Sequence, residues 1–145
     1  MGTILVVHYS QTGNTRKMAE LVAEGAKKSG KHEVKLVEAE KLDMKEFVRA
    51  DGFALGSPDY FTYMAGQMKT VFDRALAHAK EIKGKPFVSF VSHGGGGGAI
   101  ESLDRLGAAI GLVKASGGLK CQGAPGKQAA EDCRKLGESL AGAVR

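Results

Sequence analysis

The sequence predicts an α/β protein, a three-layer, doubly wound domain in which a five-stranded parallel sheet is covered by helices on both faces. Short, apolar, β-branched runs alternate with segments of helical periodicity along the whole chain. Strands that alternate with helices in this way are joined by right-handed crossovers, which lie on both faces of a parallel sheet. The length of 145 residues suits one such domain.

The first half of the chain predicts three strands and two helices. The opening strand is a run of apolar, β-branched residues, typical of a strand buried on both faces of a parallel sheet. A helix follows whose apolar side chains recur at helical spacing, and Ser29-Gly30 supplies its end. A second strand, a short helical piece and a third strand come next. In order, these elements are expected at residues 3–8, 15–29, 34–37, 42–48 and 52–56.

The second half repeats the alternation. A helix carries Met68, Val71, Phe72, Ala75 and Ala79, and an apolar strand follows it. The last strand is expected within residues 112–118, with an extension toward Cys121 left open. The remaining elements are expected as a strand at residues 86–91, a helix at 100–110 and a closing helix at 129–144. No segment resembles a linker, so residues 1–145 are expected to form a single domain.

The net charge of +5 and the pI near 9.2 raise the question of nucleic-acid binding. The basic residues, however, occur in small groups with acids interleaved and almost no aromatic residues beside them. This pattern is typical of solvated helix faces, and no nucleic-acid partner is expected.

Two further features concern the cellular context. The longest apolar run near the N-terminus is residues 4–7, too short for a membrane anchor or a signal sequence. Cys121 and Cys133 lie 12 positions apart, which matches no metal-ligand or disulfide spacing, and both are interpreted as structural. A cytoplasmic protein without an anchor is expected, as a monomer or small homo-oligomer.

Ligands of open α/β sheets bind outside the carboxyl ends of the strands, where the strand order reverses. The loop after the first strand combines hydroxyl side chains, a glycine and the N-terminus of a helix, a combination suited to a phosphate. It has no lysine and lacks the spaced glycines of a dinucleotide fingerprint, so a mononucleotide phosphate is favoured. The alternative is that Thr12 or Asn14 merely caps the helix. The candidate residues are Ser10, Gln11, Thr12, Gly13, Asn14 and Thr15.

The loops after the third and fourth strands are also unusual. Three aromatic residues within four positions of the third-strand loop could cover a flat heteroaromatic ring, or could pack together locally. Five consecutive glycines after the fourth strand could bring main-chain groups to a ligand edge, or could form a flexible connector. The candidate residues are Ser57, Pro58, Asp59, Tyr60, Phe61, Thr62 and Tyr63 in one loop, and Ser92, His93, Gly94, Gly95, Gly96, Gly97 and Gly98 in the other.

These motifs resemble those of the flavodoxin family, which binds flavin mononucleotide (FMN). The resemblance rests on Ser-x-Thr-Gly-Asn-Thr at residues 10–15, on Gly-Ser-Pro-x-Tyr-Phe at residues 56–61 and on the small-residue third loop. Residues 61–73 are more similar to the branch of tryptophan-repressor-binding-protein-like NAD(P)H:quinone oxidoreductases. The chain is shorter than that branch, so the insertions that build its tetramer are expected to be missing.

The resemblance implies a strand order of 2-1-3-4-5 and a distribution of contacts over the three loops. It places the FMN phosphate on residues 10–15, the ribityl chain and isoalloxazine on residues 57–63, and the remaining ring edge on residues 92–98. One departure concerns charge, since electron-carrying flavodoxins are typically acidic around the flavin and this chain is basic.

Two hypotheses about the function therefore stay open. One is an FMN protein that passes electrons between redox partner proteins, and the other is a reductase that takes hydride from NAD(P)H and reduces a quinone or free flavin. A receiver domain would need an acidic pair after the first strand, where the sequence reads His8-Tyr9-Ser10. A scaffold without flavin is a further alternative. The flavin would supply the chemistry, so no catalytic side chain and no metal site are assigned; His93 is expected beside the ring or in a structural role.

Overall fold

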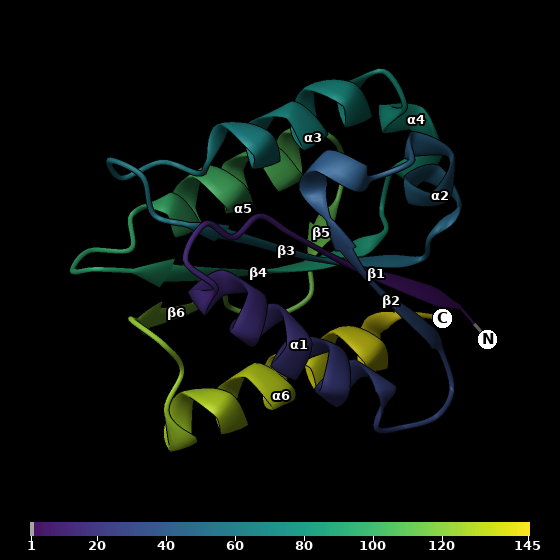
Figure 1. The fold of residues 1–145 in the computed structure, drawn as a ribbon. Helices are drawn as coiled ribbons and strands as arrows, with labels where there is room; N and C mark the ends of the chain where they lie inside the picture. Colours follow the sequence, from purple (N-terminus) through teal and green to yellow (C-terminus); the bar gives the residue numbers. More distant parts are fainter. Residues whose placement is uncertain (1) are drawn as a thin grey trace.

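In the computed structural model, which describes residues 2–145, a parallel sheet lies between two layers of helices (Figure 1). The strand order is β2-β1-β3-β4-β5, so the predicted order is confirmed. On β1, Ile4 lies opposite Val34 of β2 and Gly52 of β3. The strands are β1 (Thr3–His8), β2 (Glu33–Glu38), β3 (Gly52–Pro58), β4 (Pro86–His93), β5 (Val113–Lys114) and β6 (Leu119–Gln122).

The last position of the sheet differs from the prediction of one continuous strand. β5 pairs with β4 at Pro86 and Phe87, and β6 pairs with the same strand from Phe90 to His93. Ala115 N still donates to Phe87 O at 2.8 Å, and the small residues Ser116, Gly117 and Gly118 then interrupt the pairing, because they offer an edge strand few side chains to pack. The sheet thus has five positions and six strand segments.

Helices cover both faces of the sheet. Helices α1 and α6 pack on one face, while α2, α3 and α5 pack on the other. The predicted third helix ends earlier than expected, at Leu76, and Ala79 instead begins a separate short helix. The helices are α1 (Asn14–Lys27), α2 (Met44–Arg49), α3 (Gly66–Leu76), α4 (Ala79–Ile82), α5 (Ala99–Ala109) and α6 (Lys127–Ala143), with a 3-10 turn, η1, at Ala39–Lys41.

Helices α1 and α6 approach each other through two glycines. A Cβ on Gly25 would collide with the carbonyl oxygen of Arg134, and a Cβ on Gly137 would collide with that of Val22. Glycine at these two positions therefore lets the helices pack backbone to backbone over β1 and β3.

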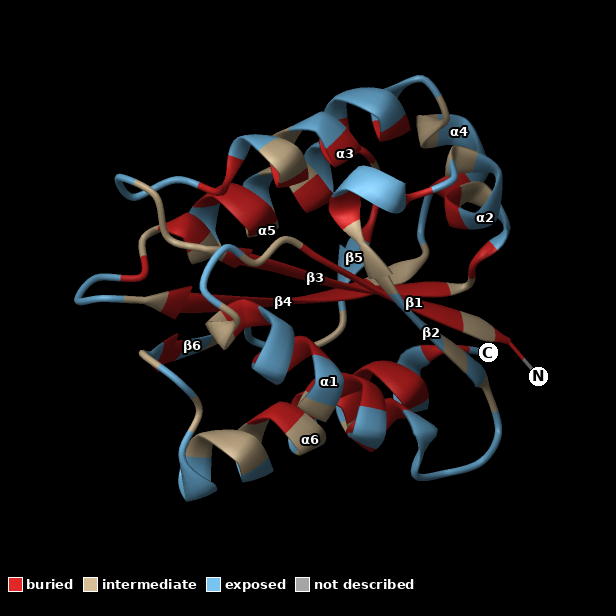
Figure 2. Ribbon diagram, in the orientation of Figure 1, coloured by how far each residue is buried: buried red, intermediate tan, exposed pale blue. Residues whose placement is uncertain are grey.

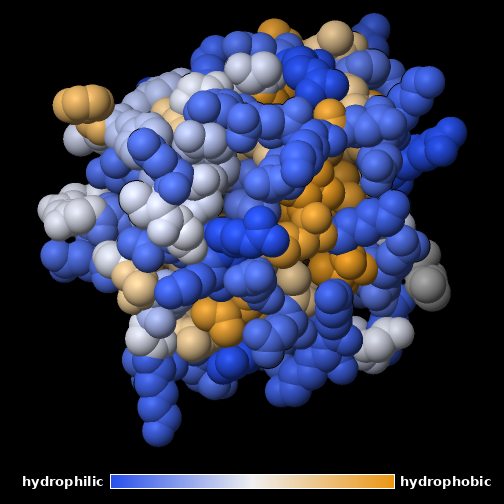
Figure 3. All heavy atoms as spheres, viewed as in Figure 1, coloured by the Kyte–Doolittle hydropathy of each residue, from blue (hydrophilic) through white to orange (hydrophobic). Residues whose placement is uncertain are grey.

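The central strands are buried on both faces, as their apolar sequences predict (Figure 2). Alternate residues of β1 enter different cores, with Ile4 and Val6 beneath α1 and α6, and Leu5 and Val7 beneath α2 and α3. The edge strand β2 is only partly covered, and Leu36 is 37% exposed. Figure 3 shows an apolar area over β2 on an otherwise largely hydrophilic face.

No helix formed by residues 2–145 is both long enough and apolar enough to cross a lipid bilayer.

Candidate functional site

The first predicted loop leads directly into helix α1. Gly13 adopts the left-handed conformation, with φ of 99°, and its N–H donates to Ser10 Oγ at 3.0 Å. The first intrahelical bond runs from Lys17 N to Gly13 O at 3.0 Å, so the N–H groups of residues 14–16 have no acceptor within the helix. No side chain at the N-cap accepts from them, and the capping interpretation of Thr12 and Asn14 is wrong. These free N–H groups, at the positive end of the helix dipole, suit an anion.

Thr15 has a different role from Thr12 in the same loop. The Thr15 side chain is buried, and its Oγ1 lies 2.7 Å from Ser92 Oγ at the end of β4. Thr12 is exposed. The Thr15 hydroxyl therefore joins the first loop to the third, while the Thr12 hydroxyl is open to a ligand.

The second loop is a tight hairpin. Tyr60 and Tyr63 exchange two backbone hydrogen bonds of 2.9 and 3.1 Å, and between them Phe61 and Thr62 have φ of 55° and 66°. Left-handed backbone costs a non-glycine residue about 1–2 kcal/mol. Phe61 is 101% exposed and Tyr63 is 41% exposed, so the two rings do not form a packed local cluster. The hairpin holds aromatic side chains open to solvent at the cost of backbone strain, which is typical of functional loops.

Tyr60 joins the second loop to the first. Its hydroxyl donates to Gln11 Oε1 at 2.6 Å. Burial raises the pKa of Tyr60 above its ordinary value, so the phenol stays protonated and able to donate at neutral pH.

Two side chains hold the end of the third loop. Asp59 accepts from Gly97 N at 3.1 Å and from Ala99 N at 3.0 Å. His93 Nδ1 accepts from Gly96 N at 3.1 Å, which gives His93 a structural role within the loop. Around Gly94 and Gly95 no protein atom would lie within 4 Å of an added Cβ. The loop is therefore anchored at its end while its tip faces open space.

Together these bonds tie the three loops to one another in pairs. We call this set the interlock: Thr15 to Ser92, Tyr60 to Gln11, and Asp59 to Gly97 and Ala99. The structure thus brings all three predicted loops to one edge of the sheet. All of these residues except Ala99 were predicted as ligand contacts, but their bonds to each other were not predicted, because the chain offers no local signal for them.

His8 lies buried at the carboxyl end of β1. It is 2% exposed, and among the described residues its Nδ1 has no hydrogen-bond partner. Burial, followed by the positive charge of Arg16, lowers the pKa of His8 below 6.5. The imidazole is therefore neutral at physiological pH.

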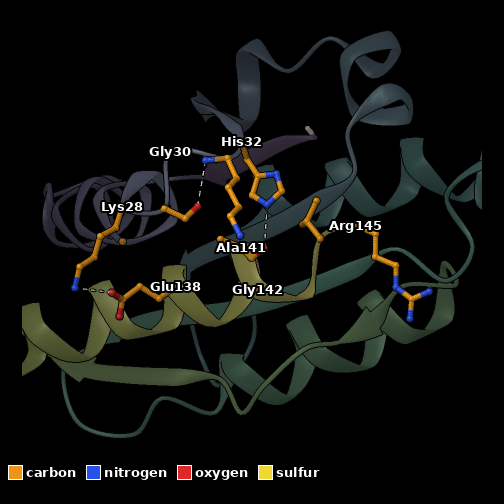
Figure 4. Close-up of a pocket in the computed structure, with 11 residues that line it drawn as sticks. Lys28, Gly30, His32, Glu138, Ala141, Gly142 and Arg145 are labelled. Carbon is orange, nitrogen blue, oxygen red and sulfur yellow. Dashed lines mark hydrogen bonds and ion pairs between the residues drawn. The ribbon is translucent and has the colours of Figure 1, made fainter.

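A groove of about 780 Å³ lies at the opposite, amino-terminal edge of the sheet (Figure 4). It is bordered by the loop between α1 and β2 and by the end of α6. Lys28 Nζ is 2.9 Å from Glu138 Oε1. His32 Nδ1 accepts from Gly2 N at 3.2 Å, and His32 Nε2 lies 3.1 Å from Ala141 O. These polar groups already have protein partners, although Lys31 and Arg145 also line the groove.

A family model described as Flavodoxin matches residues 6–137. The chain belongs to the flavodoxin family. The cofactor of this family is FMN. A flavodoxin of Aquifex aeolicus (strain VF5) is 43% identical over 102 residues, which cover 70% of this chain and 55% of that protein. The quinone-oxidoreductase QR2 of Triphysaria versicolor is 30% identical over 68% of this chain and 59% of its own length. The chain thus matches somewhat more than half the length of these curated relatives.

Among solved structures, a flavodoxin from the domain Archaea superposes with a TM-score of 0.89. It is 25% identical in sequence, and the match covers 97% of this chain and 96% of that one. The flavodoxin fold therefore accounts for nearly the whole of the described chain.

Proposed function

We propose that this flavodoxin-family chain is a redox protein that transfers electrons through a non-covalently bound FMN. The observation that carries the proposal is the interlock, which joins the loops after β1, β3 and β4 beside the free N–H groups of α1. When bound, FMN supplies the redox chemistry, and the protein supplies position and electrostatics.

The first loop would hold the phosphate. The N–H groups of residues 14–16 and the hydroxyls of Ser10 and Thr12 are donors for a dianion, and α1 adds its positive dipole end. The Thr15 hydroxyl would act indirectly, since it holds the loop against Ser92.

The second and third loops would hold the flavin ring. Phe61 and Tyr63 offer exposed aromatic faces, and a stacked aromatic pair contributes about 0.5–1.5 kcal/mol beyond its buried area. Gly94, Gly95 and Gly96 are exposed and carry no side chain, so their main-chain groups can approach a ring edge.

A reductase that uses NAD(P)H and a quinone or free flavin is the second candidate. It is favoured by the similarity to the quinone-oxidoreductase of Triphysaria versicolor and by the open space beside Gly94 and Gly95. The carrier proposal needs redox partner proteins, whereas the reductase needs only small molecules.

For either function, the two free, buried cysteines support our proposal of a reducing cytoplasmic location. A single domain and a monomer or small homo-oligomer remain predictions.

Titration of the ligand-free protein with FMN and with riboflavin tests the cofactor. Flavin fluorescence should be quenched at one FMN per chain, and riboflavin should bind at least tenfold more weakly because it lacks the phosphate. Equal affinity for the two ligands would contradict the phosphate assignment. The loaded protein is then mixed with NAD(P)H and a quinone, and rapid NAD(P)H oxidation would favour the reductase over the carrier.

A further inference from the structure

The side chain of Asp59 occupies an unusual place in the fold. It comes from the loop after β3, yet both of its carboxylate oxygens accept hydrogen bonds from the start of α5, 38 and 40 residues away in sequence. The N-cap residue of α5 is Gly98, which has no side chain to cap the helix. Asp59 therefore serves as the missing N-terminal cap from a different segment of the chain.

The backbone of Asp59 is held as firmly as its side chain. Its N–H donates to Ser92 O at 2.9 Å, which extends the pairing of β3 with β4 beyond the strand ends. Asp59 is thus attached to both ends of the third loop, at Ser92 before the glycine run, at Gly97 near the end of the run and at Ala99 after it. Its neighbour in the chain, Tyr60, begins the aromatic hairpin.

The glycine run needs such an anchor. Glycine loses more conformational entropy on ordering than any other residue, and five of them stand in a row. Gly94, Gly95 and Gly96 are exposed, so packing does little to order them. An ionised carboxylate that accepts two N–H bonds at a helix N-terminus makes charge-assisted bonds, which are the stronger kind.

We propose that Asp59 is a positioning residue that holds the glycine loop against the aromatic hairpin and so sets the gap that receives the flavin ring. This role rests on the proposed function, that the two loops hold FMN. Asp59 acts through the loops and needs no contact with the flavin. Its negative charge is directed at the start of α5 and compensated there.

The first test uses ligand-free protein. In Asp59→Ala, amide hydrogen exchange at Gly97 and Ala99 should accelerate at least tenfold, because both acceptors are lost. Asp59→Asn keeps one acceptor oxygen, so its exchange rates at Gly97 and Ala99 should lie between those of the parent and those of Asp59→Ala. Asp43→Ala is the matched control, since Asp43 caps α2 by accepting from Lys45 N at 2.9 Å. It removes a helix cap away from the three loops and should leave exchange at Gly97 and Ala99 unchanged.

The second test is binding. FMN and riboflavin should both bind Asp59→Ala at least tenfold more weakly, because the gap for their common ring is lost, and the visible spectrum of bound flavin should shift. Asp43→Ala should bind as the parent does. A merely structural role would lower stability alike in both variants and leave affinity and spectrum unchanged.

Unchanged exchange at Gly97 and Ala99 in Asp59→Ala would overturn the proposal, as would faster exchange with undiminished flavin affinity. Should Asp59→Ala not fold, Asp59→Asn decides by the same two readouts. Failure of the parent protein to bind FMN would overturn the proposed function, and the exchange data on ligand-free protein would still decide whether Asp59 holds the loop.

Discussion

The two edges of the sheet are built differently from the same strands. At the carboxyl edge, three loops are joined by hydrogen bonds between residues distant in sequence, and exposed aromatic rings and free N–H groups remain. At the amino edge, polar groups find partners within the fold, as when Lys85 Nζ donates to Val48 O and Ala50 O at 2.8 and 2.7 Å. An edge that leaves the N–H groups of a helix N-terminus unused, while hydrogen bonds join its loops, is suited to an anionic ligand.

The largest contrast is expected between two glycines with positive φ, one at each edge. Gly13 has φ of +99° and Gly30 has φ of +70°, and neither has an atom within 4 Å of an added Cβ. Alanine at either position should cost about 1–2 kcal/mol of unfolding free energy through left-handed strain. Only Gly13→Ala should also weaken FMN binding, by tenfold or more, because it redirects the N–H groups of the first loop. Chemical denaturation and flavin titration measure the two effects, and equal FMN affinity in both variants would contradict the contrast.

A second contrast concerns hydroxyl groups. Removing one partner of the buried pair in Thr15→Val or Ser92→Ala leaves the other hydroxyl unsatisfied, at a cost of about 1–3 kcal/mol. The double variant should lose less unfolding free energy than the sum of the losses in the two single variants. Ser29→Ala at the amino edge removes an exposed bond to Lys31 N and should change stability by about 0.5 kcal/mol or less. Additive losses in a double-mutant cycle would show that the Thr15–Ser92 bond does not couple the loops.

The sequence could predict most of the fold and the location of the site, for reasons particular to its residues. The run at residues 3–8 is short, apolar and rich in β-branched residues, which favours a buried strand, and the three loops follow from the rule that ligands bind at the carboxyl ends. The split of the last strand was missed because its β-forming residues are few and pairing with β4 decides which of them join the sheet. The interlock was missed because Thr15, Asp59 and Tyr60 find partners 38 to 77 residues away, and no local pattern encodes such pairs.

His8 offers a smaller, pH-dependent effect at the carboxyl edge. Its folded-state pKa is lowered by burial, so below about pH 6.5 the unfolded chain binds a proton that the folded chain does not. Stability should therefore be unaffected by His8 above pH 6.5 and should fall as the pH drops from 6.5 toward the folded-state pKa. Between pH 7.5 and pH 5.5, urea denaturation should show a smaller loss of unfolding free energy in His8→Leu than in the parent. An equal loss in the two proteins would contradict the lowered pKa of His8.

The smallest expected effect is a difference in alkylation rate between a cysteine at the sheet edge and one in the interior. Burial raises the pKa of the Cys133 thiol to about 12, and burial also raises that of Cys121, so both thiols are mostly protonated and should react slowly in the folded protein. Cys121 lies on the edge segment β6 and is 6% exposed, whereas Cys133 lies on the buried face of α6 and is 0% exposed. Alkylation at pH 8, located by peptide mass, should reach Cys121 first, and denaturant should expose both. Faster labelling of Cys133 would mean that α6 opens before the edge does.

The central claim is that FMN binds at the interlocked carboxyl edge and not in the groove at the amino edge. Backbone amide chemical shifts of the ¹⁵N-labelled protein during an FMN titration test it most directly. The account predicts large shifts at residues 10–15, 57–63 and 92–98, with saturation at one FMN per chain. Shifts confined to residues 28–32 and 141–145, or the absence of saturable shifts at the three loops, would contradict it.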